Sequence, residues 1–231
     1  MEKRPKKTPT HTLCWTTNCL KLALTVILLL PGLVASGYIP QHYQTLEPIL
    51  ALQTGTNEKP RSRELVKIFS IIEANRPDIF EREAWELSEV ILKESSKYKL
   101  DPILILAVID VESKFQFGAI SPAGARGIMQ IMPATGKFLV RRVHELAEEI
   151  KAEQFTPEHL DNPIVNIKLG TYYLHDLRKS FQNVSKALIA YNLGPTELRS
   201  RMENQIEYTD EYANAVFAAH QKFKKIKPLT F

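Results

Sequence analysis

The segment ILAVIDVESKFQFGAISPAGARGIMQIMP, residues 105–133, begins as an almost wholly apolar run and continues as a loop of Gly, Ala, Ser and Pro. Asp101 and Pro102 come just before it. An N-cap residue followed by a proline in the first turn predicts that a helix starts there. Residues 103–109 leave almost no polar face, and a helix of that kind is buried on all sides. The segment therefore predicts a helix buried in the core of the protein.

Asp110 and Glu112 are the two acids of this helix after its cap. Two residues correspond to about 200° around a helix with 3.6 residues per turn, so the two side chains cannot face one pocket. Glu112 lies at the C-terminal end, where both burial and the helix dipole disfavour an anion and raise the pKa of the carboxyl. A raised pKa suits a general acid near neutral pH. From position alone, a structural glutamate bonded to a lysine or to the backbone is the alternative.

The loop after Glu112 contains the residue types of a ligand-binding wall. Gly124 and Gly127 permit a positive φ or a close approach of the backbone to a ligand. Ser121 adds a small hydroxyl, and Met129 and Gln130 add flexible apolar and amide groups. A methionine in such a place is more often a core residue. Together these residues indicate an acid that faces a groove walled by a tight loop.

The rest of the chain predicts more helices. The 231 residues are 44% hydrophobic and 24% charged, which is typical of one folded globular domain. Apolar residues recur at helical spacing in several segments. These segments are 63–75, 85–98, 134–149, 162–180, 184–192 and 209–225. No alternating strand pattern lasts beyond a few residues, although 109–117 leaves room for a short strand. We expect a mostly α domain over 84–226, preceded at 37–83 by a linker and a short helical lead-in.

Residues 1–36 are typical of a targeting segment. They hold five Lys or Arg and one Glu, which accounts for the whole formal charge of +4. The remaining chain is neutral, so its charge does not indicate nucleic-acid binding. Residues 22–36 form an apolar run that is short for a spanning helix of roughly 20 residues and ends in small residues. We expect a cleaved secretory signal, with an uncleaved inner-membrane anchor as the alternative.

Other kinds of catalytic site are not indicated. Cys14 and Cys19 precede the apolar run, so the exported part would hold no disulfide and no thiolate metal site. His144 and Glu145 begin a metalloprotease-like H-E-x-x-H motif, but Glu148 stands where the second His is needed. No phosphate-binding glycine loop and no nucleophile elbow are present in the sequence. We therefore expect no metal and no cofactor.

Four ordered blocks resemble the lytic transglycosylase family with the soluble-lytic-transglycosylase (SLT) type of catalytic domain. The first block joins Glu112-Ser113 and Ser121 to GARGIMQIMPATG. The other three are DNPIVNIKLGTYYL (161–174), ALIAYNLGP (187–195) and YTDEYANAV (208–216). Together the blocks cover about residues 86–220, and four matches in one order are far more specific than one motif. The resemblance implies a lysozyme-like helical fold, of the type shared by goose-type lysozyme and SLT domains.

The resemblance also implies an enzyme, a lytic murein transglycosylase. Family members cleave peptidoglycan between N-acetylmuramic acid and N-acetylglucosamine without water and leave 1,6-anhydromuramic acid ends. Glu112 matches the catalytic glutamate, which protonates the glycosidic oxygen and then accepts the proton of the muramoyl 6-hydroxyl. A single carboxylate fits this reaction, because two-carboxylate glycosidases need the second as a nucleophile or to activate water. The substrate-binding positions that carry over are Ser121, Met129, Gln130, Tyr191, Asn192 and Tyr212.

The sequence departs from the family pattern at two positions. Leu193 stands where the family has Ala, and Tyr208 stands where it has Glu. These departures leave two alternatives open. One is a goose-type-like lysozyme that uses water, for which Asp161 or Asp210 would be the second carboxylate. The other is a weakly active, glycan-binding scaffold of a machine that spans the cell wall.

The expected partners and location follow from the same resemblance. We expect peptidoglycan glycan strands as the substrate and no nucleic acid, with cell-wall assembly or secretion machinery as a further candidate partner. The expected location is the bacterial periplasm or cell envelope. There the protein would be soluble after signal cleavage or anchored to the inner membrane.

Overall fold

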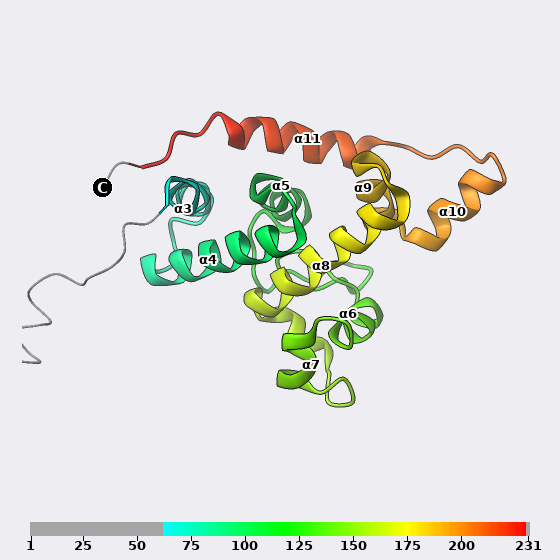
Figure 1. The fold of residues 1–231 in the computed structure, drawn as a ribbon, viewed down its shortest axis with the longest axis horizontal. Helices are drawn as coiled ribbons and strands as arrows, with labels where there is room; N and C mark the ends of the chain where they lie inside the picture. Colours follow the sequence, from blue (N-terminus) through cyan, green and yellow to red (C-terminus); the bar gives the residue numbers. More distant parts are fainter. Residues whose placement is uncertain (1–61, 230–231) are drawn as a thin grey trace, which may run out of the picture. The chain divides into compact units, whose positions relative to one another are not determined.

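The apolar periodicity of the sequence produces helices over most of residues 62–229, the part of the chain that the computed structural model describes (Figure 1). The helices are α3 (Arg63–Asn75), α4 (Glu81–Tyr98), α5 (Pro102–Ser113), α6 (Pro133–Val140), α7 (His144–Ile150), the 3-10 helix η3 (Pro157–Asp161), α8 (Pro163–Phe181), α9 (Val184–Leu193), α10 (Pro195–Glu203) and α11 (Glu211–Lys224). The only β-pairing among these residues is two isolated bridges, Ile120–Arg126 and Arg126–Ile131. The expected mostly α fold is confirmed.

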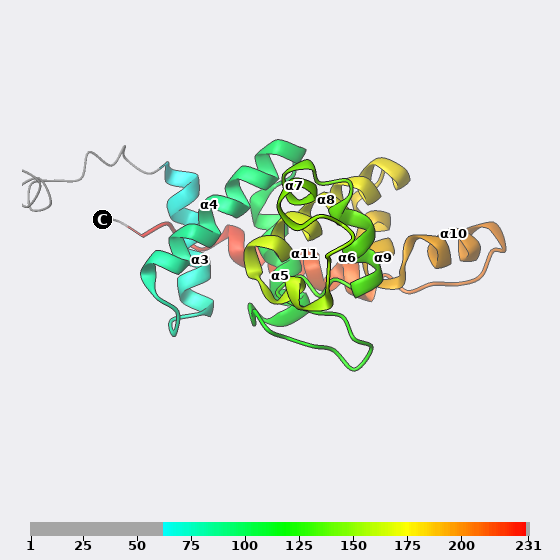
Figure 2. The same cartoon turned by 90° about the horizontal axis from the view of Figure 1, so that it is seen from below.

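α5 is the central helix. Ten of its twelve residues are buried, and α3, α4 and α11 all pack against it. Asp101 is its N-cap and accepts a hydrogen bond from Ile103 N at 2.8 Å, as the sequence predicts. α11 lies over α5 in Figure 1. Figure 2 shows a long loop, residues 114–132, that leaves the end of α5 and leads to α6. α5 therefore brings Glu112 from the core to the start of this loop.

α3 shares the core of the expected domain. Phe69 stacks on Trp85 of α4 with ring centroids 3.8 Å apart, and the α3 residues Ile68, Ile71 and Ile72 are buried. We expected α3 to be a lead-in before a domain that starts at residue 84. It belongs instead to the same structural unit as that domain, because its apolar face is covered by α4 and α5.

The segment expected as one helix over 134–149 forms two helices, α6 and α7. Arg142 N and Val143 N both donate to Leu139 O and end α6. The Val143 side chain is buried where the chain turns. No Gly or Pro marks this turn in the sequence, so the break was not visible there.

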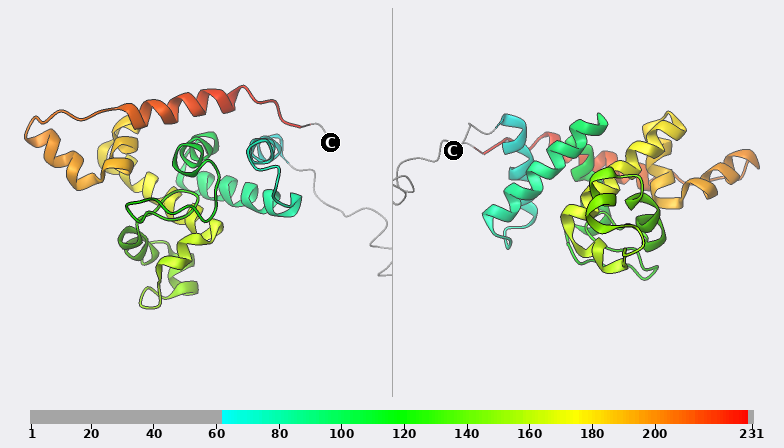
Figure 3. Two further views of the ribbon diagram at one scale, coloured as in Figure 1. Left: turned by 180° about the vertical axis from the view of Figure 1, so that it is seen from behind. Right: turned by 60° about the horizontal axis from the view of Figure 1, so that its bottom comes forward.

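Two further local features differ from expectation. The segment 109–117 forms the end of α5 and a turn instead of a strand, because Lys114 and Phe115 both have a positive φ, 53° and 62°. This reversal buries the Phe115 ring in the core. α10 was not expected from periodicity. Gly194, with φ 94°, is its N-cap, and Pro195 is in its first turn. Figure 3 shows α10 at the outer end of the helical unit.

Within residues 62–229 no helix is both long enough and apolar enough to cross a membrane. The expected signal or anchor at 1–36, and residues 37–61 of the expected linker, lie outside the described residues.

Candidate active site

A buried amide attaches the 114–132 loop to α8. Asn166 is fully buried, and its Oδ1 accepts a hydrogen bond from Met129 N at 2.7 Å. Its Nδ2 donates to Arg126 O at 2.9 Å and to Leu160 O at 2.8 Å. Gly127 lies beside it with φ 80°, and a Cβ there would come within 2.1 Å of Leu160 O. Asn166 and Gly127 thus fix the backbone path of the loop. Asn166 was not among the residues singled out from the sequence. Its position in a predicted helix, in the block 161–174, could have indicated a buried amide that bonds to the backbone.

An ion pair holds the same loop to η3. Arg126 Nε and Nη2 donate to the two carboxylate oxygens of Asp161 at 3.0 and 2.6 Å, and Glu158 lies 3.7 Å from Nη1. Such a bidentate pair has fixed geometry. Asp161, one candidate for a second catalytic carboxylate, is therefore engaged in holding the loop.

The loop is also joined to the end of α5. The Ser113 hydroxyl is buried and lies 2.7 Å from Ile128 O, to which it donates. The next carbonyl, that of Met129, accepts a hydrogen bond from the Tyr191 hydroxyl at 2.9 Å. The Met129 side chain is fully buried against Gly170, where a Cβ would lie 2.5 Å from its sulfur. Met129 was expected to line the groove. In this structure its side chain packs in the core, and its carbonyl orients Tyr191.

Glu112 lies at the exit of α5 from the core. Its Oε1 accepts a hydrogen bond from the Tyr212 hydroxyl at 2.5 Å. Burial raises the pKa of Glu112 to about 7, and the hydrogen bond from Tyr212 opposes this rise. A group with such a pKa is populated in both its acid and its base form at neutral pH. The rise has the direction expected from the sequence, and burial is its cause.

Two tyrosines from other helices converge on this carboxyl group. Tyr212 comes from α11 and Tyr191 from α9. Burial, and secondly the charge of Glu112, raise the pKa of both phenols well above the usual value. Both hydroxyls therefore remain donors at neutral pH. Tyr173 of α8 packs against the Tyr191 ring with centroids 5.3 Å apart. Tyr173 was not a candidate in the sequence, although the second block contains it.

No second carboxylate among residues 62–229 contributes to the pKa shift of Glu112. Asp110 points elsewhere and pairs with Lys114 at 3.3 Å, as the helical geometry predicts. Asp210, the other candidate, is an exposed residue at the start of α11. Within the described part of the chain, no three His, Asp or Glu side chains are grouped to hold a metal ion.

The remaining candidates lie on the loop and at the end of α9. Ser121 Oγ accepts from Ala125 N at 3.0 Å and closes a turn in the loop. Gln130 Nε2 donates to Ala119 O at 2.9 Å and to a second loop carbonyl. Asn192 is exposed, and its side chain makes no hydrogen bond within residues 62–229. The structure thus brings Tyr212 and Tyr191 to Glu112, uses Ser121 and Gln130 to shape the loop, and leaves Asn192 at the surface.

Comparison with known proteins matches this region to one family. The family model described as the transglycosylase SLT domain matches residues 89–214, more than half of the chain. This range includes α5, the loop, α8 with Asn166, α9 with Tyr191, and the start of α11 with Tyr212.

Two curated relatives share the name membrane-bound lytic murein transglycosylase C. The protein from Sodalis glossinidius is 30% identical over 127 residues, which are 54% of this chain and 34% of the relative. The protein from Actinobacillus pleuropneumoniae serotype 5b is 36% identical over 93 residues, 40% of this chain and 24% of the relative. The chain thus spans about a third or less of these relatives.

Solved structures of similar fold are also lytic transglycosylases. The 70 kDa soluble lytic transglycosylase of Escherichia coli has a TM-score of 0.53 at 24% identity, over 74% of this chain and 32% of that one. A 70 kDa soluble lytic transglycosylase in complex with bulgecin A also has a TM-score of 0.53, at 23% identity over 74% of this chain and 32% of that one. An inactive glutamate-to-glutamine mutant from Pseudomonas aeruginosa gives 0.51 at 20%, over 81% of this chain and 35% of that one. At these identities the likeness concerns the fold, and the expected lysozyme-like fold is confirmed.

Proposed function

Because this chain belongs to the transglycosylase SLT domain family, we propose that it is a lytic transglycosylase that cleaves the glycan strands of peptidoglycan. The observation that carries the proposal is Glu112, a carboxyl group with a pKa of about 7 that accepts a short hydrogen bond from Tyr212. A group with this pKa can give and take back a proton within one turnover at neutral pH.

In the first step Glu112 donates its proton to the glycosidic oxygen between N-acetylmuramic acid and N-acetylglucosamine. The bond from that oxygen to muramoyl C1 breaks, and positive charge develops on the muramoyl ring. The substrate's own N-acetyl group would stabilise this centre, because no second carboxylate among residues 62–229 contributes to the pKa shift of Glu112. The Tyr212 hydroxyl donates to the carboxylate that remains and stabilises it.

In the second step the muramoyl 6-hydroxyl attacks C1, and Glu112 accepts the hydroxyl proton. One 1,6-anhydro ring forms, one glycosidic bond is lost and no water is consumed. Glu112 ends the cycle protonated, as it began. The raised pKa matters in both steps. A carboxyl group with the usual pKa is almost fully ionised at neutral pH and could not donate the first proton, whereas a pKa near 7 keeps both the acid and the base form populated.

The other site residues are proposed to act in two ways. Asn192 would contact the substrate, because it is exposed near Tyr191 in the sequence and its side chain has no hydrogen bond within the described residues. Ser121 and Gln130 would shape the loop as a wall of the glycan groove. Met129 would act through its carbonyl, which positions Tyr191.

Mass spectrometry of digested peptidoglycan sacculi tests the reaction. We expect muropeptides with 1,6-anhydromuramic acid ends, and their loss in Glu112→Gln. Asp110→Asn is a matched control, because it changes a carboxyl group of the same helix that pairs with Lys114. Products one water molecule heavier, with reducing ends, would mean a hydrolase of the goose-type kind. The engagement of Asp161 with Arg126 argues against that alternative.

We further propose that the protein works in the bacterial cell envelope. The relatives described as membrane-bound murein transglycosylases support this location. Residues 1–36 would provide a secretory signal or an inner-membrane anchor. N-terminal sequencing of the exported protein decides between them: a mature chain that starts near residue 37 indicates cleavage, and an intact start indicates an anchor.

A role as a scaffold is tested separately from catalysis. If a strain carrying Glu112→Gln kept the full biological effect of the parent, the chain would serve by binding a wall-spanning machine and not by cleaving glycan. We expect the effect to be lost with the anhydro products.

A further inference from the structure

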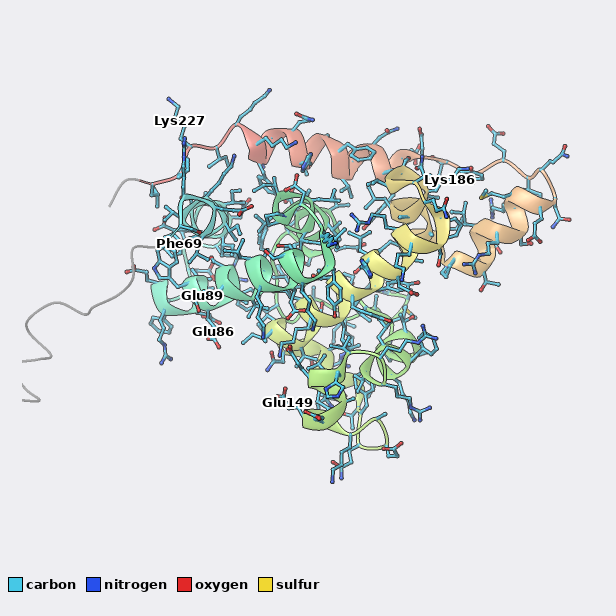
Figure 4. The ribbon with its side chains drawn as sticks, in the orientation of Figure 1. Phe69, Glu86, Glu89, Glu149, Lys186 and Lys227 are labelled. Carbon is cyan, nitrogen blue, oxygen red and sulfur yellow. The ribbon has the colours of Figure 1, made fainter. Side chains whose placement is uncertain are left out.

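Five lysines lie where the C-terminal segment passes over α3. They are Lys67, Lys222, Lys224, Lys225 and Lys227, and we call them the lysine edge. Lys67 Nζ donates to the backbone carbonyl of Lys224 at 2.9 Å. Farther along, Leu229 N donates to Ser70 Oγ at 3.0 Å. These two bonds hold the segment on α3, and Figure 4 shows Lys227 above that helix. The five lysines therefore gather where α3 meets the end of α11 and the segment that follows it.

The lysine edge has few acidic neighbours. After Glu211 the sequence contains no Asp or Glu, and none of the five lysines forms an ion pair within residues 62–229. Elsewhere bases are paired: Lys93, Lys97 and Lys168 all lie within 3.8 Å of Glu145. Since residues 62–229 carry as many acids as bases, this edge is a local concentration of charge, suited to an anionic partner.

Apolar groups accompany these charges. Leu229 is 43% exposed at the end of the same segment, and Ile226 is partly buried between the lysines. Lysine stems with an exposed leucine suit an interface that has phosphate groups outside and hydrocarbon beneath. We propose that the lysine edge binds the anionic headgroups of a lipid bilayer. A lysine near such a surface strengthens binding about fivefold.

The lysine edge is remote from Glu112. Tyr212, the partner of Glu112, and Lys224 are at opposite ends of α11, which at 1.5 Å per residue are about 18 Å apart along the helix. If the Lys224 end of α11 contacts lipid, Glu112 at the Tyr212 end remains free to bind glycan. This consequence rests on the proposed function.

The length of the chain before α3 agrees with a membrane partner. Twenty-six residues, 37–62, lie between the apolar N-terminal segment and α3. Even fully extended they span at most about 90 Å. If the apolar segment is the proposed anchor and lies in a bilayer, this length keeps the lysine edge within reach of the bilayer surface.

Lysine acetylation of the full chain, read by mass spectrometry, tests the proposal. The protein is reconstituted with vesicles of phosphatidylglycerol and phosphatidylcholine, or of phosphatidylcholine alone. We expect acetylation at the lysine edge to be at least fivefold slower on the anionic vesicles, and the protection to be lost at about 1 M salt. Lys151 and Lys186 serve as internal references, since they lie outside the edge (Figure 4 labels Lys186 on α9).

A matched pair of variants completes the test. One combines Lys222→Gln, Lys224→Gln, Lys225→Gln and Lys227→Gln and keeps Lys67 as the reporter. The control makes the same charge change elsewhere, at Lys93, Lys99, Lys137 and Lys179, and keeps the references Lys151 and Lys186. We expect Lys67 to lose its protection on anionic vesicles in the first variant and to keep it in the control.

Three results would overturn the proposal. They are equal acetylation on both kinds of vesicle, protection of Lys67 in the four-lysine variant, and protection by purified peptidoglycan in place of lipid, which would indicate a wall polymer as the partner. Cleavage of soluble glycan strands, measured in parallel, reports on Glu112. A chain that cleaves glycan without protecting its lysines would therefore refute this inference and leave the proposed function standing.

Discussion

Two glutamates of this protein, the partly buried Glu112 and the fully buried Glu94, both have a raised pKa, and burial is the main cause for each. Their surroundings differ. Glu112 stands at the open end of α5 and accepts a hydrogen bond from Tyr212. Glu94 is 0% exposed on α4, and neither of its carboxyl oxygens has a hydrogen-bond partner within residues 62–229. Lys97 Nζ is 3.8 Å from it.

A raised pKa alone therefore does not mark a catalytic acid. Burial makes both groups reluctant to ionise. Only Glu112 combines this with a donor that supports the ionised form and with access from outside the core, and a group that must give and retake a proton needs both. Glu94 has neither a hydrogen-bond donor nor access from outside the core. Its burial therefore lowers the free energy of unfolding at neutral pH and serves no catalytic step. Substitutions at the two sites and at their neighbours test this contrast.

Glu112→Gln should abolish catalysis. Loss of a general acid and base lowers the rate by about 10²–10⁴-fold, and here one residue supplies both roles, so the upper end is expected. Stability should rise at pH 8, where the parent must hold a buried anion and the amide need not. The measurements are release of anhydro muropeptides and thermal unfolding. Unfolding of the variant would instead indicate a structural glutamate.

Asn166→Ala should cost about 3 kcal/mol of unfolding free energy, because it leaves the buried Met129 N–H and the carbonyls of Arg126 and Leu160 without their partner. The loop that orients Tyr191 would loosen, so activity should fall as well. Urea unfolding checks the first effect. Asn183→Ala is a control, since it removes only the exposed N-cap of α9, at a cost of about 1 kcal/mol. Equal losses for the two variants would contradict the role given to Asn166.

Tyr212→Phe should raise the pKa of Glu112 further, because the lost hydrogen bond lowers that pKa in the parent. The acid form starts the reaction, so the activity of the parent should fall as pH rises through about 7. In the variant this fall should move about one pH unit upward, since a hydrogen bond to a charged group contributes about 1.5–3 kcal/mol. The pH profile of kcat/KM measures it. Tyr173→Phe, whose ring packs against Tyr191, should leave the profile in place.

Glu94→Gln should stabilise the protein by roughly 1 kcal/mol above neutral pH and leave activity unchanged. The folded-state pKa of Glu94 lies above the unfolded value, so the parent loses stability as pH rises from the unfolded pKa through the folded one. Below both values the carboxyl is protonated in both states, and the variant and the parent should be equally stable. Thermal unfolding at pH 4 and pH 8 decides. A destabilised variant at pH 8 would mean that the pair with Lys97 outweighs the burial of charge.

Local chemistry made much of the fold predictable. The bounds expected for α3 agree with the structure, and the N-caps at Asp101 and Asn183 are where their side chains indicated. Helical periodicity repeats within a few residues, so the sequence displays it directly. The break between α6 and α7 was missed, because a buried Val143 and backbone bonds to Leu139 cause it, and neither leaves a turn residue in the sequence.

Four features could be derived from the sequence without the structure: the protein is mostly helical, α5 is buried, Asp110 and Glu112 face different ways, and burial raises the pKa of Glu112. All of these follow from residue type and helical geometry within one segment. Only the tertiary structure decided which groups meet. Tyr212, one hundred residues from Glu112, reaches its carboxyl, and Asn166 supports the loop from α8. The C-terminal lysines lie beside Lys67 of α3. Such contacts depend on how distant helices pack, and that packing is set by the whole core rather than by any one segment.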